Sequence, residues 1–412
     1  MSPSLPRWAQ QTLVLLFVAG RLHGARDSVV MGHHRINHVL TLGRPWAFLF
    51  GVKSGKAVAK FRTPFPTIEV VPRIWPHEPE VLRAVGTRLT DTPKCLGDFG
   101  ECSVHSFVPG KTLSEAVQEG TIGYDRQRVL ADFFAALADV PLEELPALPD
   151  DWPDNGDSTG FLHWLARFVV EHVHRPNLER FGELFAAVGI PEDAMERFMR
   201  TAPELTRRPF SLLHTDVHRG NVVLARGPDG EQLVVIDWEL ALYGDPLHDL
   251  ATHLVRMDYD PTEREQMIKL WAEAMYAAGH ASATNSLEDD LPVYLGFAYA
   301  QSVFADVMRA ALKLGRFPGE EDYVYAARRV CRAASRAKEP LGLPYLRLDE
   351  RGAVDALRRW HARDDRVSLV PGSRKGARGW DEPQEDRPQG EKSGNGAIGA
   401  TWFLISTASL LW

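Results

Sequence analysis

The feature that most constrains this chain is a pair of short apolar runs whose outer ends carry polar side chains. The run 222–225 (VVLA) begins directly after Asn221, and the run 233–236 (LVVI) ends directly before Asp237. Between the runs lies the segment 227–230 (GPDG), whose glycines, proline and aspartate are typical of a tight turn. The pattern predicts a β-hairpin that brings the side chains of Asn221 and Asp237 to the same end.

A further acidic residue, Asp216, lies five positions before Asn221 in the segment 213–221 (LHTDVHRGN). Protein kinases have a related pattern, H-R-D-x-x-x-x-N followed by D-F-G, with the same spacing between aspartate and asparagine. Phosphoryl transfer from a nucleotide needs a carboxylate that accepts from a hydroxyl group and oxygen ligands for Mg²⁺. Together with Asp237, these residues predict a kinase of small molecules. The alternative interpretation is a buried hairpin whose polar ends have no catalytic role.

Three segments, 214–221 (HTDVHRGN), 236–239 (IDWE) and 244–251 (GDPLHDLA), resemble the aminoglycoside phosphotransferase family. That family shares the fold of the protein kinases and includes choline and homoserine kinases. The resemblance implies an α+β, protein-kinase-like fold of two lobes, a small β-rich N-terminal lobe and a larger, mostly helical C-terminal lobe. Thr215 and Arg219 stand where the family usually has glycine and proline, and neither position carries the chemistry.

The resemblance also implies roles for the polar residues of these segments. Asp216 is implied as the catalytic carboxylate, and we expect His214, in the same loop, to brace the loop rather than to titrate. Asn221 and Asp237 are implied as the magnesium ligands. Two later aspartates are implied to support the catalytic loop, namely Asp245 and Asp249.

The resemblance implies two lobes, a nucleotide-binding lobe (28–108) and a lobe with the catalytic loop and acceptor pocket (109–345). Composition sets apart an N-terminal extension (1–27) and a tail (346–412). The tail is rich in glycine, proline and charged residues from 364 onward, so we expect most of it to be disordered. Its last sixteen residues, 397–412, are mostly apolar but fall short of the roughly twenty that span a bilayer. No membrane partner is therefore expected, and a C-terminal anchor is the weaker interpretation.

The triphosphate needs a flexible loop and a cation from the first lobe. Gly32, followed by Asn37, marks the loop that closes over the phosphates in the resembling family. Two residues compete as the cation. Lys60 ends a strand-like run (AVAK) and is of the usual type, whereas Arg73 follows Pro72, which is a poor residue inside a strand. We prefer Lys60 and leave Arg73 open.

A glutamate on a helix normally pairs with this cation. Glu78 opens the helical segment 78–85 and is the preferred candidate, with Glu80 as the alternative. The resemblance further places the adenine edge at the link between the lobes, against the backbone of Ser106, Phe107 and Val108.

Composition sets the remaining limits. The net charge of −8 argues against a general nucleic-acid partner. The three cysteines show neither metal-ligand nor disulfide spacing, which favours a reducing compartment, and we expect a cytoplasmic protein. A hydrolase with two metal ions is a rival interpretation because the chain also offers a set of possible metal ligands: His214, Asp216, His218, Asp237, His248 and Asp249.

The sequence thus predicts an enzyme that transfers the γ-phosphoryl group of ATP to a hydroxyl group of a small molecule, with Mg²⁺ as cofactor. A catalytically silent nucleotide-binding regulator of the same fold is the alternative, and protein-kinase activity is disfavoured because there is no room for a long activation segment after Asp237. The acceptor and the choice between ATP and GTP stay open. For a cationic acceptor the acidic candidates are Asp258, Asp260 and Glu263, although such a charge group is usually a solvated face.

Overall fold

The fold is known from a computed structural model, which describes residues 29–31, 36–41, 56–61, 70–89, 91–98, 102–117, 120–227, 230–343 and 347–364. The predicted N-terminal extension, Gly32 and the tail beyond 364 lie outside these residues. Some strand residues are described by their backbone only, and Lys60 is one of them.

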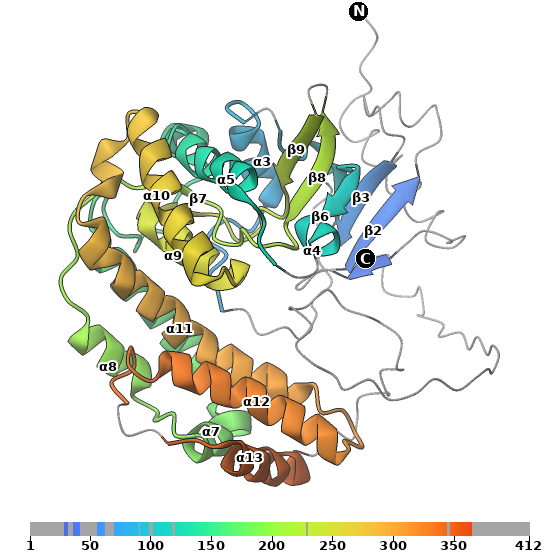
Figure 1. Ribbon diagram of the computed structural model, residues 1–412, viewed down its shortest axis with the longest axis vertical. Coiled ribbons are helices and arrows are strands. Elements are labelled where there is room, and N and C mark those ends of the chain that lie inside the picture. Colours follow the sequence, from blue (N-terminus) through green and yellow to red (C-terminus); the bar gives the residue numbers. More distant parts are fainter. Residues whose placement is uncertain are drawn as a thin grey trace, which may run out of the picture. The chain divides into compact units, whose positions relative to one another are not determined.

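A five-stranded antiparallel sheet comes first along the chain (Figure 1). Its strand order is β1-β2-β3-β5-β4, with β3 paired between β2 and β5. The backbone of Lys60 in β3 lies opposite Asn37 in β2 and Ser103 in β5. The strands are β1 (Val29–Met31), β2 (Ile36–Thr41), β3 (Lys56–Phe61), β4 (Cys95–Asp98) and β5 (Cys102–Ser106).

One helix, α3 (Glu78–Val85), is inserted between β3 and β4. Pro79 and the acidic first turn are favourable at a helix start, as the sequence predicts. The segment before α3 is held to the later part of the chain, because the Trp75 indole donates to the backbone oxygens of Pro146 (3.1 Å) and Ala147 (3.2 Å). Gln301 likewise donates to the backbone oxygen of Val70.

Two small sheets follow, and the three-stranded one contains the predicted hairpin. One has the order β6-β8-β9 and the other pairs β7 with β10, both antiparallel. These strands are β6 (Gly110–Thr112), β7 (Ser211–Leu213), β8 (Val222–Gly227), β9 (Gly230–Val235) and β10 (Leu242–Gly244).

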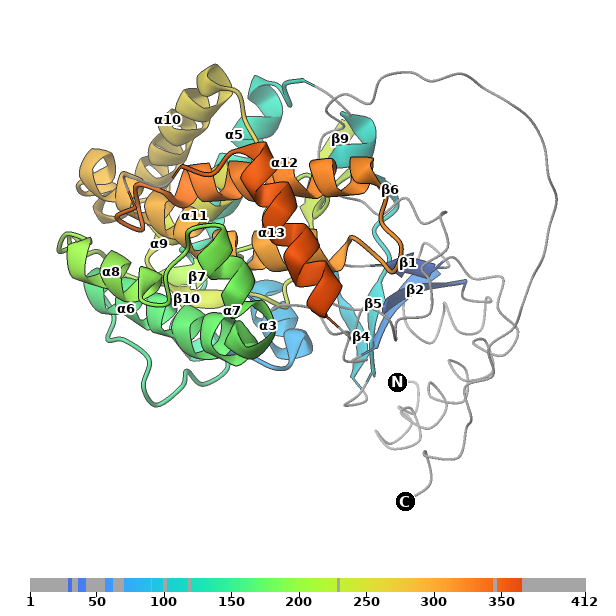
Figure 2. The same ribbon diagram turned by 90° about the horizontal axis from the view of Figure 1, so that it is seen from below.

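The rest of the described chain is mostly helical (Figures 1 and 2). The long α11 packs against α9 and α12, α10 packs against α5, and α12 against α13. The helices are α4 (Leu113–Ala116), α5 (Tyr124–Leu137), α6 (Ser158–Phe168), α7 (Leu178–Ala187), α8 (Ala194–Thr201), α9 (Pro246–Met257), α10 (Pro261–Ala277), α11 (Leu287–Leu312), α12 (Glu320–Ala337) and α13 (Glu350–Arg363). Four shorter helical turns are η1 (Leu142–Glu144), η2 (Val169–His174), η3 (Arg175–Asn177) and η4 (Ala281–Thr284).

The predicted α+β class is confirmed, with a small sheet early in the chain and helices dominating after it. Among the helices that the structure describes, none has both the length and the apolar character needed to cross a membrane.

A buried polar cluster fixes the start of α9. Asp245 caps this helix by accepting from the Leu247 backbone N–H at 3.0 Å. Its other oxygen accepts from the Arg208 guanidinium (2.5 Å) and the Tyr294 hydroxyl (2.9 Å). Arg208 also pairs with Asp290, so its buried charge is compensated. Asp245 therefore joins α9 to α11, which carries Tyr294 and Asp290.

Burial also keeps several histidines neutral. On α9, His248 and His253 are almost fully buried, and desolvation lowers the pKa of each to about 4. The ring of His248 packs among Phe161, Tyr294 and Phe297. An unfolded histidine takes up a proton below about pH 6.5, whereas the folded His248 does so only near pH 4. The free energy of unfolding should therefore decrease as the pH falls from 6.5 to 4.

Replacing His248 with leucine should flatten this pH dependence. At pH 4.5 the histidine costs roughly 2–3 kcal/mol relative to pH 7, and His248→Leu removes that term. Urea unfolding at pH 7 and 4.5 measures the change in the free energy of unfolding between the two pH values. His172→Leu, at an exposed position, is the control. If His248→Leu lost as much stability between the two pH values as the unmodified protein, the neutral state assigned to the buried His248 would be wrong.

Candidate active site

The predicted hairpin is present as strands β8 and β9. Val222 lies opposite Val235, and the Ile236 backbone N–H donates to the Asn221 backbone oxygen at 2.9 Å. Asn221 and Asp237 therefore emerge at the same end of the hairpin. Asp237 has a left-handed backbone (φ 70°), which aspartate tolerates better than most residues.

Asp216 and Asn221 are directly joined. The Asn221 side-chain nitrogen donates to the Asp216 backbone oxygen (3.0 Å) and to its Oδ2 (2.9 Å). Both residues are buried. These bonds fix the orientation of the Asn221 amide and leave its side-chain oxygen, Oδ1, for another ligand.

A left-handed turn at Thr215 shapes the catalytic loop. Thr215 has φ 61°, a conformation that costs a non-glycine residue about 1–2 kcal/mol. Its hydroxyl donates to the Leu240 backbone oxygen at 2.6 Å, a bond that glycine could not make. The side chain thus offsets the backbone strain at this position.

Asp249 supports the same turn through two hydrogen bonds. Its two carboxylate oxygens accept from the backbone N–H groups of His214 (2.7 Å) and Thr215 (2.8 Å). Burial raises the pKa of Asp249 to about 7, although these two hydrogen bonds oppose the shift. The contacts are those expected of a residue that supports the loop.

The His214 ring packs between Phe133 and Trp238, with centroids 6.3 and 4.6 Å away. Its Nδ1 accepts from the Asp216 backbone N–H at 3.3 Å. Burial lowers the pKa of His214 to about 3, against the opposing charge of Asp237. The ring is therefore neutral near pH 7, and its contacts help to fix the backbone of the loop.

Two predicted residues of the first lobe reach the Asp237 segment. Glu78 is buried, and its Oε1 accepts from the Trp238 backbone N–H at 3.1 Å. The Arg73 guanidinium lies 3.4 Å from the Glu239 carboxylate. Both side chains thus lie within two positions of Asp237 along the hairpin end.

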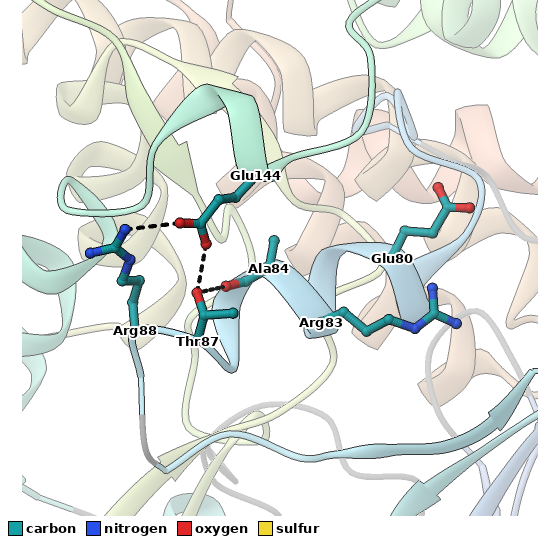
Figure 3. Close-up of a pocket in the computed structure, with 6 residues that line it drawn as sticks. All are labelled: Glu80, Arg83, Ala84, Thr87, Arg88 and Glu144. Carbon is teal, nitrogen blue, oxygen red and sulfur yellow. Dashed lines mark hydrogen bonds and ion pairs between the residues drawn. The ribbon is translucent and has the colours of Figure 1, made fainter.

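Glu80, the alternative helix glutamate, lies on the other face of α3. It is exposed and lines a surface hollow of about 630 Å³ with Arg83, Ala84, Thr87, Arg88 and Glu144 (Figure 3). Glu144 there accepts from Thr87 (2.6 Å) and Arg88 (2.8 Å). None of the residues that line the hollow belongs to the loop 214–221, and its ion pair between Arg88 and Glu144 is exposed.

At the predicted adenine edge, Ser106 is engaged with the sheet. Its backbone N–H donates to the Lys94 backbone oxygen, and its hydroxyl accepts from the Lys94 N–H, both at 2.8 Å. Phe107 and Val108 follow directly, half-buried and outside any strand.

The rival metal cluster is not assembled among the residues that the structure describes, where no three His, Cys, Asp or Glu side chains gather as a site. His248 is buried among aromatic rings and Asp249 binds backbone N–H groups. His248 therefore serves the packing of α9, and Asp249 supports the loop that carries His214 and Thr215.

The sequence patterns did not predict the position of Arg256 or the contacts of Arg219. The Arg256 guanidinium, from the last turn of α9, contacts Asp216 Oδ1. Arg219 donates to the backbone oxygens of Met257 (3.2 Å) and Gly120 (3.0 Å), which ties the loop to two other segments. Arg256 lies forty positions after Asp216, so no local pattern connects them.

Replacing Asp249 with asparagine should loosen this loop. The new amide nitrogen would face a backbone N–H and leave it unpaired, at a cost of roughly 1–3 kcal/mol. Urea unfolding at pH 8, where Asp249 is mostly ionised, measures the loss. Asp258→Asn, at the exposed end of the same helix, is the control. Equal stability of the two variants would contradict the supporting role.

The family model described as "Phosphotransferase enzyme family" matches residues 50–281, more than half of the chain. Among solved structures, the chain is similar to an ethanolamine kinase of Plasmodium vivax, at 12% identity over 78% of this chain and 86% of that one (TM-score 0.46). It is also similar to a putative aminoglycoside phosphotransferase of Ralstonia eutropha, at 13% identity over 85% and 98% (TM-score 0.46).

Among curated proteins, no sequence matches the chain. The structural likenesses are remote, so the assignment depends on the sequence match and on the motifs around Asp216, Asn221 and Asp237 that lie within it. On that match, the chain belongs to the phosphotransferase enzyme family.

Proposed function

We propose that this phosphotransferase moves the γ-phosphoryl group of ATP to a hydroxyl group of a small molecule, with Mg²⁺ as cofactor. The observation that carries the proposal is the joined pair of Asp216 and Asn221 at the end of the hairpin that ends in Asp237. Three oxygen-bearing side chains with these roles are what phosphoryl transfer requires.

Asp216 would orient the acceptor hydroxyl and accept its proton. Its Oδ2 is occupied by the Asn221 amide, so Oδ1 is the oxygen that would face the acceptor. The hydroxyl oxygen forms a bond to the γ-phosphorus as the bond to the β–γ bridging oxygen breaks. ADP leaves, and the hydroxyl proton passes to Asp216.

The donor set fits a magnesium ion. Oδ1 of Asn221 is left for a ligand and Asp237 supplies a carboxylate, and Mg²⁺ prefers such hard oxygen donors. Once bound, the ion would neutralise the charge on the phosphate oxygens. Asn221 and Asp237 would hold it.

The first lobe would supply the rest of the nucleotide site. We propose Gly32 for the phosphate loop, Lys60 or Arg73 for the cation, and the backbone of Ser106, Phe107 and Val108 for the adenine edge. Glu78 would position the Asp237 segment through its bond to the Trp238 N–H. We propose the cytoplasm as the location, because ATP and a reducing environment are found there.

Asp216→Asn should separate chemistry from binding. The change keeps the shape of the side chain but removes the proton acceptor, so turnover should fall roughly 10²–10⁴-fold while binding of magnesium ADP stays near normal. ADP release across a panel of hydroxylated metabolites and antibiotics measures turnover. Calorimetry measures the binding of magnesium ADP. Asp355→Asn, at an exposed position on α13, is the control.

If the unmodified protein bound magnesium ATP but never consumed it with any acceptor, a silent regulator would replace the proposal. Unchanged turnover in Asp216→Asn would instead remove Asp216 from the chemistry.

Asp237→Asn should weaken the response to magnesium. Loss of one negative ligand should raise the Mg²⁺ concentration for half-maximal rate by roughly tenfold or more, with partial recovery at high Mg²⁺. Rates over a magnesium titration test this. An unchanged magnesium dependence would exclude Asp237 as a ligand.

A further inference from the structure

Two nitrogen-bearing side chains lie near one carboxylate oxygen of Asp216. Its Oδ1 contacts the Arg256 guanidinium, and His218 Nε2 lies 3.6 Å from the same oxygen. The Arg256 side chain is partly buried, with 31% of it exposed to solvent. The same oxygen is the one proposed above to accept the hydroxyl proton.

A second arginine acts on this site from α11, which packs against α9 (Figure 1). Burial, and then the positive charge of Arg309, lower the pKa of Arg256 to about 10, while Asp306 opposes the shift. Arg256 therefore stays charged at neutral pH. Its guanidinium contacts the proposed proton acceptor, and both Arg309 and Asp306 are close enough to influence it.

The acidic residues that the sequence offered to a cationic acceptor are engaged elsewhere. Asp260 caps α10 by accepting from the Glu263 N–H at 2.9 Å. Glu263 is buried and accepts from the Ile122 N–H at 2.6 Å. Asp258 lies 3.6 Å from Arg336. A cationic acceptor would thus meet Arg256 without a compensating cluster from these residues.

Arg256 contacts the oxygen of Asp216 that would accept the hydroxyl proton, so an anion on the acceptor would compete with Asp216 for this guanidinium. Guanidinium groups bind carboxylate and phosphate with two parallel hydrogen bonds, and an acceptor carrying such a group would supply that anion. The geometry points to an acceptor whose hydroxyl lies a few bonds from a carboxylate or phosphate, with Arg256 as the residue that recognises this anionic group and thereby frees Asp216. This inference rests on the proposed function and narrows its acceptor class.

The test uses four probes on one three-carbon skeleton: glycerate, glycerol 3-phosphate, neutral glycerol and cationic 3-amino-1,2-propanediol. Calorimetry in the presence of magnesium ADP measures binding, and ADP release from ATP measures transfer. The anionic probes should bind to the full-length protein more tightly than the other two. Arg256→Gln should weaken their binding roughly 10–100-fold, the effect of losing hydrogen bonds between charged groups. Arg328→Gln, at an exposed position on α12, is the control.

The two anionic probes distinguish carboxylate from phosphate as the preferred group. Absence of binding by both, or binding that Arg256→Gln leaves unchanged, would overturn the inference. If anionic probes bind through Arg256 but no acceptor ever yields ADP, the anion site stands and the proposed transfer fails. If glycerol or the amine yields ADP and neither anion binds, transfer stands and the anionic acceptor class is wrong.

Discussion

The carboxylate of Asp249 accepts hydrogen bonds from two successive backbone N–H groups, those of His214 and Thr215, and so fixes the loop that carries Asp216. Buried N–H groups are costly to leave unpaired, and this one side chain satisfies both. The same bonds hold Thr215 in its left-handed turn, with help from its hydroxyl. Asp245 then fixes the first turn of the helix that carries Asp249. The backbone before Asp216 is thus fixed by Asp249 and by the Thr215 hydroxyl, and the Asn221 amide holds the Asp216 carboxylate.

The end of the hairpin that carries Asp237 is held by residues from a much earlier part of the chain. Glu78 of α3 binds the backbone next to Asp237, and Arg73 lies beside Glu239. The segment that carries both residues is anchored in turn by Trp75 and Gln301. A residue proposed as a metal ligand is therefore positioned by a helix about 160 positions earlier in the chain.

Local patterns were enough for the parts of the site that are local in sequence. The hairpin follows from two apolar runs and a turn, and the preference for Glu78 over Glu80 follows from its place at the start of the helical segment 78–85. Contacts across the fold could not be predicted in this way. Arg256 contacts Asp216 because α9 packs against the loop in the folded chain. An arginine in the last turn of a helix is common for electrostatic reasons alone, so its presence in the sequence did not indicate this contact. The acidic group of Asp260 and Glu263 was ambiguous because a helix cap and a binding carboxylate have the same composition.

The end of α9 touches the catalytic loop at two neighbouring points. The Met257 carbonyl receives the Arg219 guanidinium, and the preceding residue, Arg256, meets Asp216. Arg219 and Asp216 lie three positions apart in the same loop. A shift of this single helical turn would therefore be transmitted to the loop on both sides of Val217, which couples the end of α9 to the carboxylate of Asp216.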